Sequence, residues 1–275
     1  MGINQTNVSK GLTHFFLLLG VFVMLFPFLW MLLSSFKSNI ELLRIPITIL
    51  PEKIDFSGYN RVRTGNIFVP YMNTIIVSVS IVACQLVTAS MAACAFARLD
   101  FPGKKIFFFL ILCMLMIPPH MTLVTKFKVV SNLGMSNQLI GIIAPSFISI
   151  TVTFFFRQGF MTFPRDLEDA AIIDGCSRAR IFAQILIPLQ KAILTAMGIM
   201  ILLFAWNDLL WPLVVINSEK RRVLSIFIAL ARGDFFTDYS YYMAASTCAI
   251  APMIIVYSIF QKAFVSAITM SGIKG

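Results

Sequence analysis

The charged side chains that could do chemistry in this 275-residue chain gather in one short hydrophilic stretch. Asp166, Glu168 and Asp169 follow closely after Pro164, and Gly175 ends the stretch. Proline suits the first turn of a helix, and acidic side chains there are stabilised by the positive end of the helix dipole. Glycine readily adopts the left-handed conformation that closes a helix. The spacing therefore predicts a short acidic helix with a sharp end at Gly175.

One face of this helix is suited to contact with another surface. Its members, which recur at helical spacing, are Leu167, Ala170, Ala171 and Asp174. The small alanines would let a partner approach closely. Ser177 is expected to cap a second helix. Pro188 then connects this helix to the next apolar run. The alternative, which the pattern leaves open, is a re-entry helix that lies on the membrane plane.

Residues that could support catalysis or bind a metal are scattered along the rest of the chain. The five cysteines form no C-x-x-C pair, and their odd number gives no disulfide framework. They are Cys84, Cys94, Cys113, Cys176 and Cys248. His14 and His120 are far apart and have no ligand partners nearby in sequence. We expect no metal, no cofactor and no enzymatic activity in this chain.

The elements that must position the acidic stretch are long apolar runs. Hydrophobic residues make up 59% of the chain and charged residues 12%, and the mean hydropathy is +0.88. A soluble domain carries about twice that charged fraction. About 20 apolar residues cross the hydrocarbon layer as a helix, and six runs reach that length. They cover residues 15–33, 71–97, 106–125, 129–156, 192–216 and 239–261. The sequence thus predicts an all-α, polytopic membrane bundle of six helices that forms a single domain, residues 1–275.

Three of these runs are interrupted or closed by residues that disfavour a continuous apolar helix. Pro118-Pro119 is expected to end or kink the third span, Arg157 to close the fourth, and Asp208 interrupts the fifth. Six spans put both termini on one side. The 22 Lys and Arg residues then divide equally between the two sides, so the positive-inside rule gives no orientation. The basic residues lie at the ends of apolar runs, so the net charge of +10 indicates anchoring at the membrane edge rather than nucleic-acid binding.

Polar residues within the spans are candidates for a solute pathway. A carboxylate in a membrane span is costly in lipid, so Asp208 and its neighbour Asn207 are expected to face protein or water. An equally open alternative places Asp208 near the outer headgroups, where it caps a helix or pairs with a loop arginine. Ser146 and Ser149 in the fourth span are weaker candidates, since small hydroxyl residues serve helix packing as readily.

The acidic stretch is similar to a known motif. Asp169-Ala170-Ala171-x-x-Asp174-Gly175, then nine residues, then Ile185-Leu186-Ile187-Pro188, resembles the EAA loop of ABC importer permeases. Asp169 stands for the motif's Glu and Ile187 for its Leu, but the spacing is intact, and Glu168 could supply the longer carboxylate. Three further segments resemble the maltose-type branch that takes up carbohydrates, and within it the shorter, G-type partner of a permease pair. They are residues 97–104, 206–212 and 271–275.

The resemblance implies a type I ABC importer permease fold and ATP-driven uptake of a sugar, with an oligosaccharide expected. The loop, residues 157–191, would dock on a separate ATPase and so place both termini in the cytoplasm, with the chain in the plasma membrane of a prokaryote. The docking residues would be Glu168, Asp169, Ala170, Ala171, Asp174, Gly175, Ile185 and Pro188. ATP and magnesium would belong to the ATPase, because this chain has no G-x-x-x-x-G-K-[ST] loop to hold nucleotide phosphates.

Further partners follow from the same resemblance: a second permease subunit, two ATPase subunits and an extracytoplasmic solute-binding protein. The tail that would reach the ATPase interface is Ser271, Gly272, Ile273, Lys274 and Gly275. Residues 217–238 would contact the binding protein, through Gly233, Asp234, Phe235 and Phe236. Two alternatives stay open at this point: an ABC permease for a non-sugar solute such as a polyol phosphate, and a secondary transporter that works alone.

Overall fold

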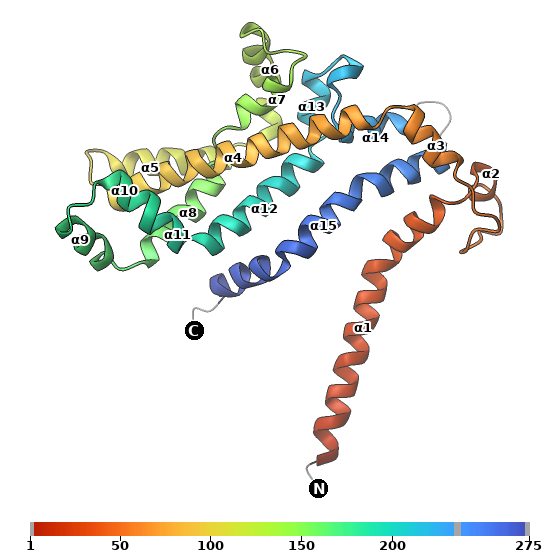
Figure 1. Ribbon diagram of the computed structural model, residues 1–275, viewed down its shortest axis with the longest axis horizontal. Helices are drawn as coiled ribbons and strands as arrows, with labels where there is room; N and C mark the ends of the chain where they lie inside the picture. The colour runs from red at the N-terminus through yellow and green to blue at the C-terminus, as the bar shows by residue number, and fades with distance from the viewer. Residues whose placement is uncertain (1–2, 234–237, 273–275) are drawn as a thin grey trace. The chain divides into compact units, whose positions relative to one another are not determined.

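All secondary structure in the described part of the chain is helical (Figure 1). The computed structural model describes residues 3–233 and 238–272, and no strand occurs within them. The α-helices in chain order are α1 Ile3–Ser34, α2 Asn39–Leu42, α3 Ser57–Thr64, α4 Phe68–Arg98, α5 Lys104–Cys113, α6 Leu123–Asn132, α7 Leu139–Ile143, α8 Ile150–Thr162, α9 Asp166–Ile173, α10 Arg178–Ile181, α11 Ile187–Leu189, α12 Lys191–Asn207, α13 Leu210–Val215, α14 Leu224–Ala231 and α15 Tyr239–Gly272. Short 3-10 turns cover Met114–Met116, Pro119–Thr122, Ala144–Ser146 and Glu219–Arg221, and a π-helical turn covers Phe182–Leu186. The predicted all-α class is confirmed.

Three helices are long and apolar enough to cross a membrane without interruption. They cover Leu12–Ser34 in α1, Phe68–Arg98 in α4 and Tyr239–Gln261 in α15. Three pairs of helical segments pass the same test of length and composition, each with a bend at a short break. These are Lys104–Met116 with Pro119–Asn132 at 92°, Leu139–Ser146 with Ile150–Thr162 at 40°, and Arg178–Leu189 with Lys191–Asn207 at 78°. If each bent pair is one span, the described residues hold six, in agreement with the prediction.

The third span bends where the sequence predicts it. Its first segment ends at Met116 and its second begins at Pro119, so Pro118 lies in the break. Proline has no backbone N–H and its ring collides with the preceding helical turn, which explains why the helix stops here.

Two predicted span boundaries are wrong. Arg157 does not close the fourth span, because α8 continues to Thr162. The guanidinium of Arg157 lies 4.0 Å from the centre of the Phe108 ring, and its Nε donates to the Phe96 carbonyl at 3.3 Å. The helices thus accommodate the charge between them. The fifth span is not continuous to residue 216, since α12 ends at Asn207 and α13 begins only after a two-residue break.

The chain divides into two compact units, each assembled from separate stretches of sequence. Unit 1 comprises Met1–Ile67 and Phe227–Ala251, and unit 2 comprises Phe68–Ile226 and Pro252–Gly275. Each unit has its own cluster of buried hydrophobic side chains. They are therefore described separately.

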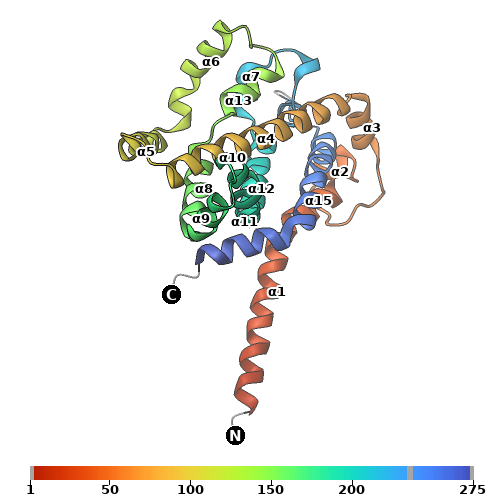
Figure 2. The same ribbon diagram turned by 60° about the vertical axis from the view of Figure 1, so that its left-hand side comes forward.

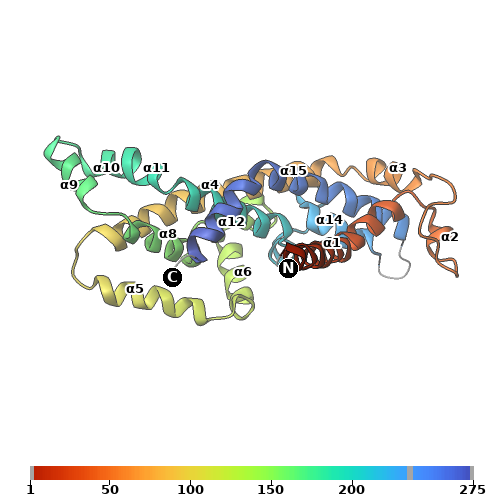
Figure 3. The same cartoon turned by 90° about the horizontal axis from the view of Figure 1, so that it is seen from below.

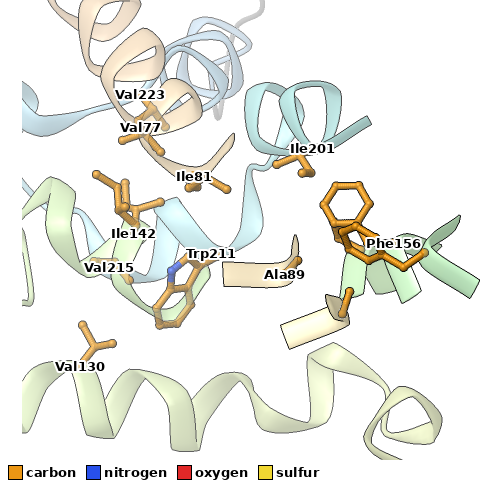
Figure 4. Packing of buried hydrophobic residues seen from close by; sticks show 14 of the residues in the cluster. Val77, Ile81, Ala89, Val130, Ile142, Phe156, Ile201, Trp211, Val215 and Val223 are labelled. Atoms are coloured by element: carbon orange, nitrogen blue, oxygen red, sulfur yellow. The ribbon is translucent and has the colours of Figure 1, made fainter. Parts of the chain in front are cut away.

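The core of unit 2 forms where α4 packs along α8 and α12 (Figures 1 and 3). Ala89 and Ala93 of α4 are fully buried, as is Phe156 of α8. Small side chains let helices approach closely in a membrane, so these alanines make room for the phenylalanine ring. Figure 4 shows the cluster, in which Ile201 comes from α12, while Trp211 and Val215 come from α13.

The core of unit 1 joins α3 to the first part of α15 (Figure 2). Val62 packs with Ala244 and Ala245, which are both fully buried. An ion pair between Arg61 and Asp238 lies at the edge of this contact. These contacts fix the segment that leads out of the first span.

Candidate coupling site

Helix α9 ends in a complete set of backbone hydrogen bonds around Gly175. The N–H of Gly175 donates to the Ile172 carbonyl at 3.0 Å, and the N–H of Cys176 donates to the Ala171 carbonyl at 2.9 Å. These two bonds form the Schellman motif, which places a left-handed residue at the helix end. Gly175 has a φ of +78°, as the sequence predicts. A Cβ here would meet no atom within 4 Å, so the backbone conformation, rather than lack of space, requires glycine.

The beginning of α9 carries the predicted acidic turn. Asp166, Glu168 and Asp169 all lie in the first turn, at the positive end of the helix dipole. The helix begins at Asp166, so Pro164 precedes the first turn instead of occupying its first position.

The second helical segment begins with the predicted serine cap. The side chain of Ser177 accepts a hydrogen bond from the Arg180 N–H at 3.4 Å, and α10 starts at the next residue. Ile181 and Leu186 of this segment are buried, Ile185 is half-buried and Pro188 is exposed. The segment then meets α12 at the 78° bend, where the fully buried Gln190 donates to the Phe156 carbonyl at 3.4 Å.

The two alanines of the motif face opposite ways. Ala171 is only 6% exposed and belongs to the core of unit 2, whereas Ala170 is exposed together with Asp169 and Asp174. The expectation that both alanines share an accessible face is therefore wrong for Ala171, because α9 uses that side to pack on its own chain. The outward surface also carries three large apolar side chains, Leu167, Ile172 and Ile173.

Glu168 forms an ion pair within the chain. Its carboxylate lies 2.6 Å from Nε of Arg98, the last residue of α4, and both side chains are largely buried, at 15% and 8% exposed. A second guanidinium nitrogen of Arg98 donates to the Phe163 carbonyl at 3.0 Å. One arginine thus holds Phe163, which directly follows α8, and Glu168, which lies inside α9. Glu168 already has this partner, whereas Asp169 and Asp174 are accessible carboxylates of the motif.

A cavity of about 210 Å³ lies beside this ion pair. Its walls come from the end of α4, from α9 and from the α10 segment, and they include Cys94, Leu99, Ile172, Arg178 and Leu186. The residues predicted to dock therefore lie on a short, hydrogen-bonded elbow at the end of unit 2, close to the ends of α4 and α8 (Figures 1 and 3).

A second group of predicted residues lies at the break in the fifth span. Asp208 follows the last residue of α12, and its carboxylate accepts a hydrogen bond from the Trp211 N–H at 3.4 Å. Its backbone carbonyl accepts a bond from the Ser225 hydroxyl at 2.7 Å. Asn207 is exposed and donates to the Leu203 carbonyl at 2.8 Å. The capping alternative for Asp208 thus agrees with this geometry.

The break in the fourth span is stabilised by polar side chains of α4. Gln85 donates to the Ser146 carbonyl at 2.7 Å, and Thr88 donates to the Phe147 carbonyl at 2.6 Å. Ser149 begins α8 as its cap and accepts from the Val152 N–H at 3.3 Å. Carbonyls freed by a break in a membrane helix need such donors. Ser146 and Ser149 therefore take part in helix structure, the reading favoured for hydroxyl residues here.

Lys126 and Trp211 link the broken third and fifth spans. The ammonium of Lys126, in α6, lies 4.0 Å from the centre of the Trp211 ring in α13. Trp211 is only 4% exposed and belongs to the unit 2 core. A cation over an indole ring is attracted by the electrons of the ring, which stabilises the contact between the two helices.

A family model described as "binding-protein-dependent transport system inner membrane component" matches residues 85–270. The chain belongs to this family. The match contains residues 157–191 and all three bent pairs of helical segments that follow α4. The chain is thus a multi-pass permease of a transport system, and it is a transport subunit rather than an enzyme.

Named relatives of this permease extend over nearly its whole length. The arabinooligosaccharides transport system permease protein AraQ of Bacillus subtilis is 35% identical, over 96% of this chain and 95% of the relative. AraQ of Halalkalibacterium halodurans is 34% identical over 92% of both chains. The sn-glycerol-3-phosphate transport system permease protein UgpE of Brucella abortus is 31% identical, over 97% of this chain and 98% of the relative.

The permease also shares its fold with a solved structure. A chain of a bacterial ABC transporter involved in the import of the acidic polysaccharide alginate matches with a TM-score of 0.82 and 22% identity. The match covers 94% of this permease and 98% of that chain. The predicted ABC importer permease fold is therefore confirmed.

Some predicted contact residues are only partly described. Ser271 and Gly272 are the last residues of α15, while Ile273, Lys274 and Gly275 lie outside the described residues. Gly233 has a φ of +67°, and Asp234, Phe235 and Phe236 also lie outside.

Sequence reasoning missed Arg98 and Lys126 as parts of the permease architecture. The available signal for Arg98 was its position as the first charge after an apolar run of 27 residues, 71–97. This position by itself indicates only that the span ends there. Within the described residues, no group of three or more His, Cys, Asp or Glu side chains is arranged to hold a metal ion.

Proposed function

We propose that this permease is the G-type subunit of an ATP-driven sugar importer and that the elbow, residues 157–191, docks on its ATPase. The observation that carries the proposal is the exposed outer surface of α9. Asp169, Ala170 and Asp174 offer charge and a small side chain there, while the Schellman turn and the Ser177 cap fix the backbone. A site that transmits force must be rigid, and hydrogen bonds to the backbone close the turn at Gly175 and cap α10 at Ser177.

Docking on the ATPase defines the orientation that we propose. Residues 157–191 lie in the cytoplasm, and with six spans both termini lie there too, in the plasma membrane of a prokaryote. Residues 217–238 then face the opposite side, where an extracytoplasmic solute-binding protein delivers the solute. A second permease subunit and two ATPase subunits complete the assembly, in which residues 1–275 act as one permease domain.

Alternating access explains how this assembly moves a solute. Closure of the ATPase subunits on ATP moves α9 on each permease. The spans then change from inward-open to outward-open, because the outward-open state binds the closed ATPase more tightly than the inward-open state does. The ATPase supplies ATP and magnesium. In this chain, the bends at 92° and 40° are places where spans can change direction during the transition, and the 78° bend joins the elbow to α12.

An oligosaccharide is the solute that we propose. The two AraQ relatives, at 34% and 35% identity, belong to arabinooligosaccharide systems. The second candidate is a polyol phosphate, which the UgpE relative at 31% identity favours. A phosphate would need several cations along the pathway. Lys126 and Arg157, two of the cations in the described broken spans, are already engaged over the rings of Trp211 and Phe108, which favours the carbohydrate.

Two measurements test this proposal on the complex of both permeases and the ATPase. In a background without native cysteines, Asp169→Cys is expected to crosslink to the ATPase, while Lys53→Cys, an exposed residue of the first extracytoplasmic loop, is the control that stays unlinked. Uptake into proteoliposomes is then compared for arabino-oligosaccharides and sn-glycerol 3-phosphate, each with a matching binding protein. Absence of the Asp169 crosslink overturns docking, and uptake of the phosphate alone overturns the sugar assignment.

A further inference from the structure

The geometry points to Arg98 and Glu168 as a clasp that makes the elbow and α4 move as one body when the ATPase drives transport. The clasp is defined as the Arg98–Glu168 ion pair together with the hydrogen bond from Arg98 to the Phe163 carbonyl. Both are positioning residues, which act through α9 and α4 without touching the solute. This inference rests on the proposed docking of α9 on the ATPase.

The clasp spans two parts of the chain that are far apart in sequence. Arg98 is the last residue of the second span, and Glu168 lies in the first turn of α9. The elbow is covalently connected only to the fourth and fifth spans, through α8 and the α10 segment. Without the clasp, a push on α9 would reach α4 only through side-chain packing.

Packing alone leaves a gap at this place. The cavity of about 210 Å³ between the end of α4 and α9 is lined by Cys94 and Leu99 on one side and by Ile172 on the other. Arg98 reaches Glu168 at the edge of this cavity. With 8% and 15% of their side chains exposed, the two charges are shielded from water, so their attraction is stronger than that of a surface pair.

The other side of the clasp is held by α8 and α5. Phe96, two residues before Arg98, accepts the hydrogen bond from Arg157, whose guanidinium lies over the Phe108 ring. The end of α4 is thus fixed to α8 and α5 as well as to α9. A displacement of α9 is therefore passed to the second span, whose alanines pack on α8 in the core.

The clasp predicts a fixed distance that can be measured on the assembled transporter. Spin labels are placed at Ile173 of α9 and Val87 of α4, which are both exposed, and their separation is recorded by pulsed electron resonance with and without ATP and vanadate. We expect one narrow distribution that ATP leaves unchanged in the parent complex. In Arg98→Gln and in Glu168→Gln, ATP should broaden or shift it, and arabino-oligosaccharide uptake per ATP hydrolysed should fall about tenfold, within the usual range for linked sites.

Charge reversal and a nearby control separate coupling from simple stability. The double variant Arg98→Glu with Glu168→Arg restores the ion pair and should regain the narrow distribution and at least half of the uptake per ATP. Arg165→Gln removes a cation from the same cavity wall and should behave like the parent. The clasp is overturned if the label distances are unchanged in both single variants. It is also overturned if the double variant recovers neither the narrow distribution nor the uptake per ATP, or if none of the clasp variants inserts.

A failure of the proposed function has a different signature. In that case Asp169→Cys, with Arg98 and Glu168 intact, forms no crosslink to the ATPase. Failure of the clasp alone leaves that crosslink in place while the label distances stay unaffected by the substitutions.

Discussion

The N–H of Cys176 donates to the carbonyl of Ala171 at 2.9 Å, across a turn that only a left-handed residue can make. Together with the bond from the Gly175 N–H to the Ile172 carbonyl, this bond closes α9 before α10 begins. The side chain of Ala171 is buried, while that of the neighbouring Ala170 remains accessible.

Substitution of Gly175 should damage this turn in a graded way. Gly175→Ala forces a Cβ into left-handed geometry at about 1–2 kcal/mol, and Gly175→Asn should cost less, because Asn tolerates that region. Gly175→Pro should be worst, since it also removes the N–H that donates to the Ile172 carbonyl. We expect ATPase coupling to fall in the order Asn, Ala, Pro while the chain still inserts. Equal transport by Gly175→Pro and the parent would contradict this role.

Asp169 should contribute to ATPase affinity through its exposed charge. Asp169→Arg is expected to weaken binding of the ATPase to the isolated permease pair by about tenfold, equivalent to ~1.4 kcal/mol. The affinity loss should shrink as salt is raised, because exposed charges are screened. Glu219→Arg, in the loop proposed to face the other side, is the control. A salt-independent loss, or an equal loss in the control, would argue against direct pairing.

Gln85 should stabilise the break in the fourth span. Gln85→Leu leaves the Ser146 carbonyl without its donor, so the thermal stability of the permease in detergent should drop by an amount equivalent to about 1–3 kcal/mol. Val87→Leu, an exposed position on the same helix, should change little. If both variants melt alike, water or lipid satisfies the carbonyl instead.

The contact between the Lys126 ammonium and the Trp211 ring should contribute measurably to the stability of the permease. Lys126→Met removes about 0.5–2 kcal/mol of attraction between α6 and α13, whereas Lys126→Arg should retain most of it. Lys128→Met, on the same helix but exposed, provides the matched control. Thermal unfolding of the three variants checks the order, and a larger effect at Lys128 would refute it.

Local signals in the sequence were sufficient to predict the turn and the helix cap of the elbow. Gly175 and Ser177 act on backbone groups within five residues, so their types alone predicted the helix end and the following cap. Pro118 likewise predicted a bend from its missing N–H. The apolar runs predicted the spans because lipid requires about 20 residues of low polarity.

Contacts between distant residues could not be predicted in the same way. Arg98 and Glu168 are separated by the whole third and fourth spans, and no pattern in either segment identifies the other. Arg157 was expected to end a helix because the aromatic ring that accepts its charge lies in another span. Asp208 predicts an interruption of the fifth apolar run, but not the bond from the Ser225 hydroxyl to the Asp208 carbonyl, because Ser225 lies in another helix.

The division of unit 1 into two stretches has a consequence for biosynthesis. Its core joins Val62 to Ala244 and Ala245, which leave the ribosome about 180 residues later, or roughly 10–40 s at ordinary translation rates. The unit 2 core, from Val77 to Ile226, can close within that interval. The segment around Val62 must therefore wait without its partner until Ala244 and Ala245 are made, so it reaches its final packing after many residues that are synthesised later.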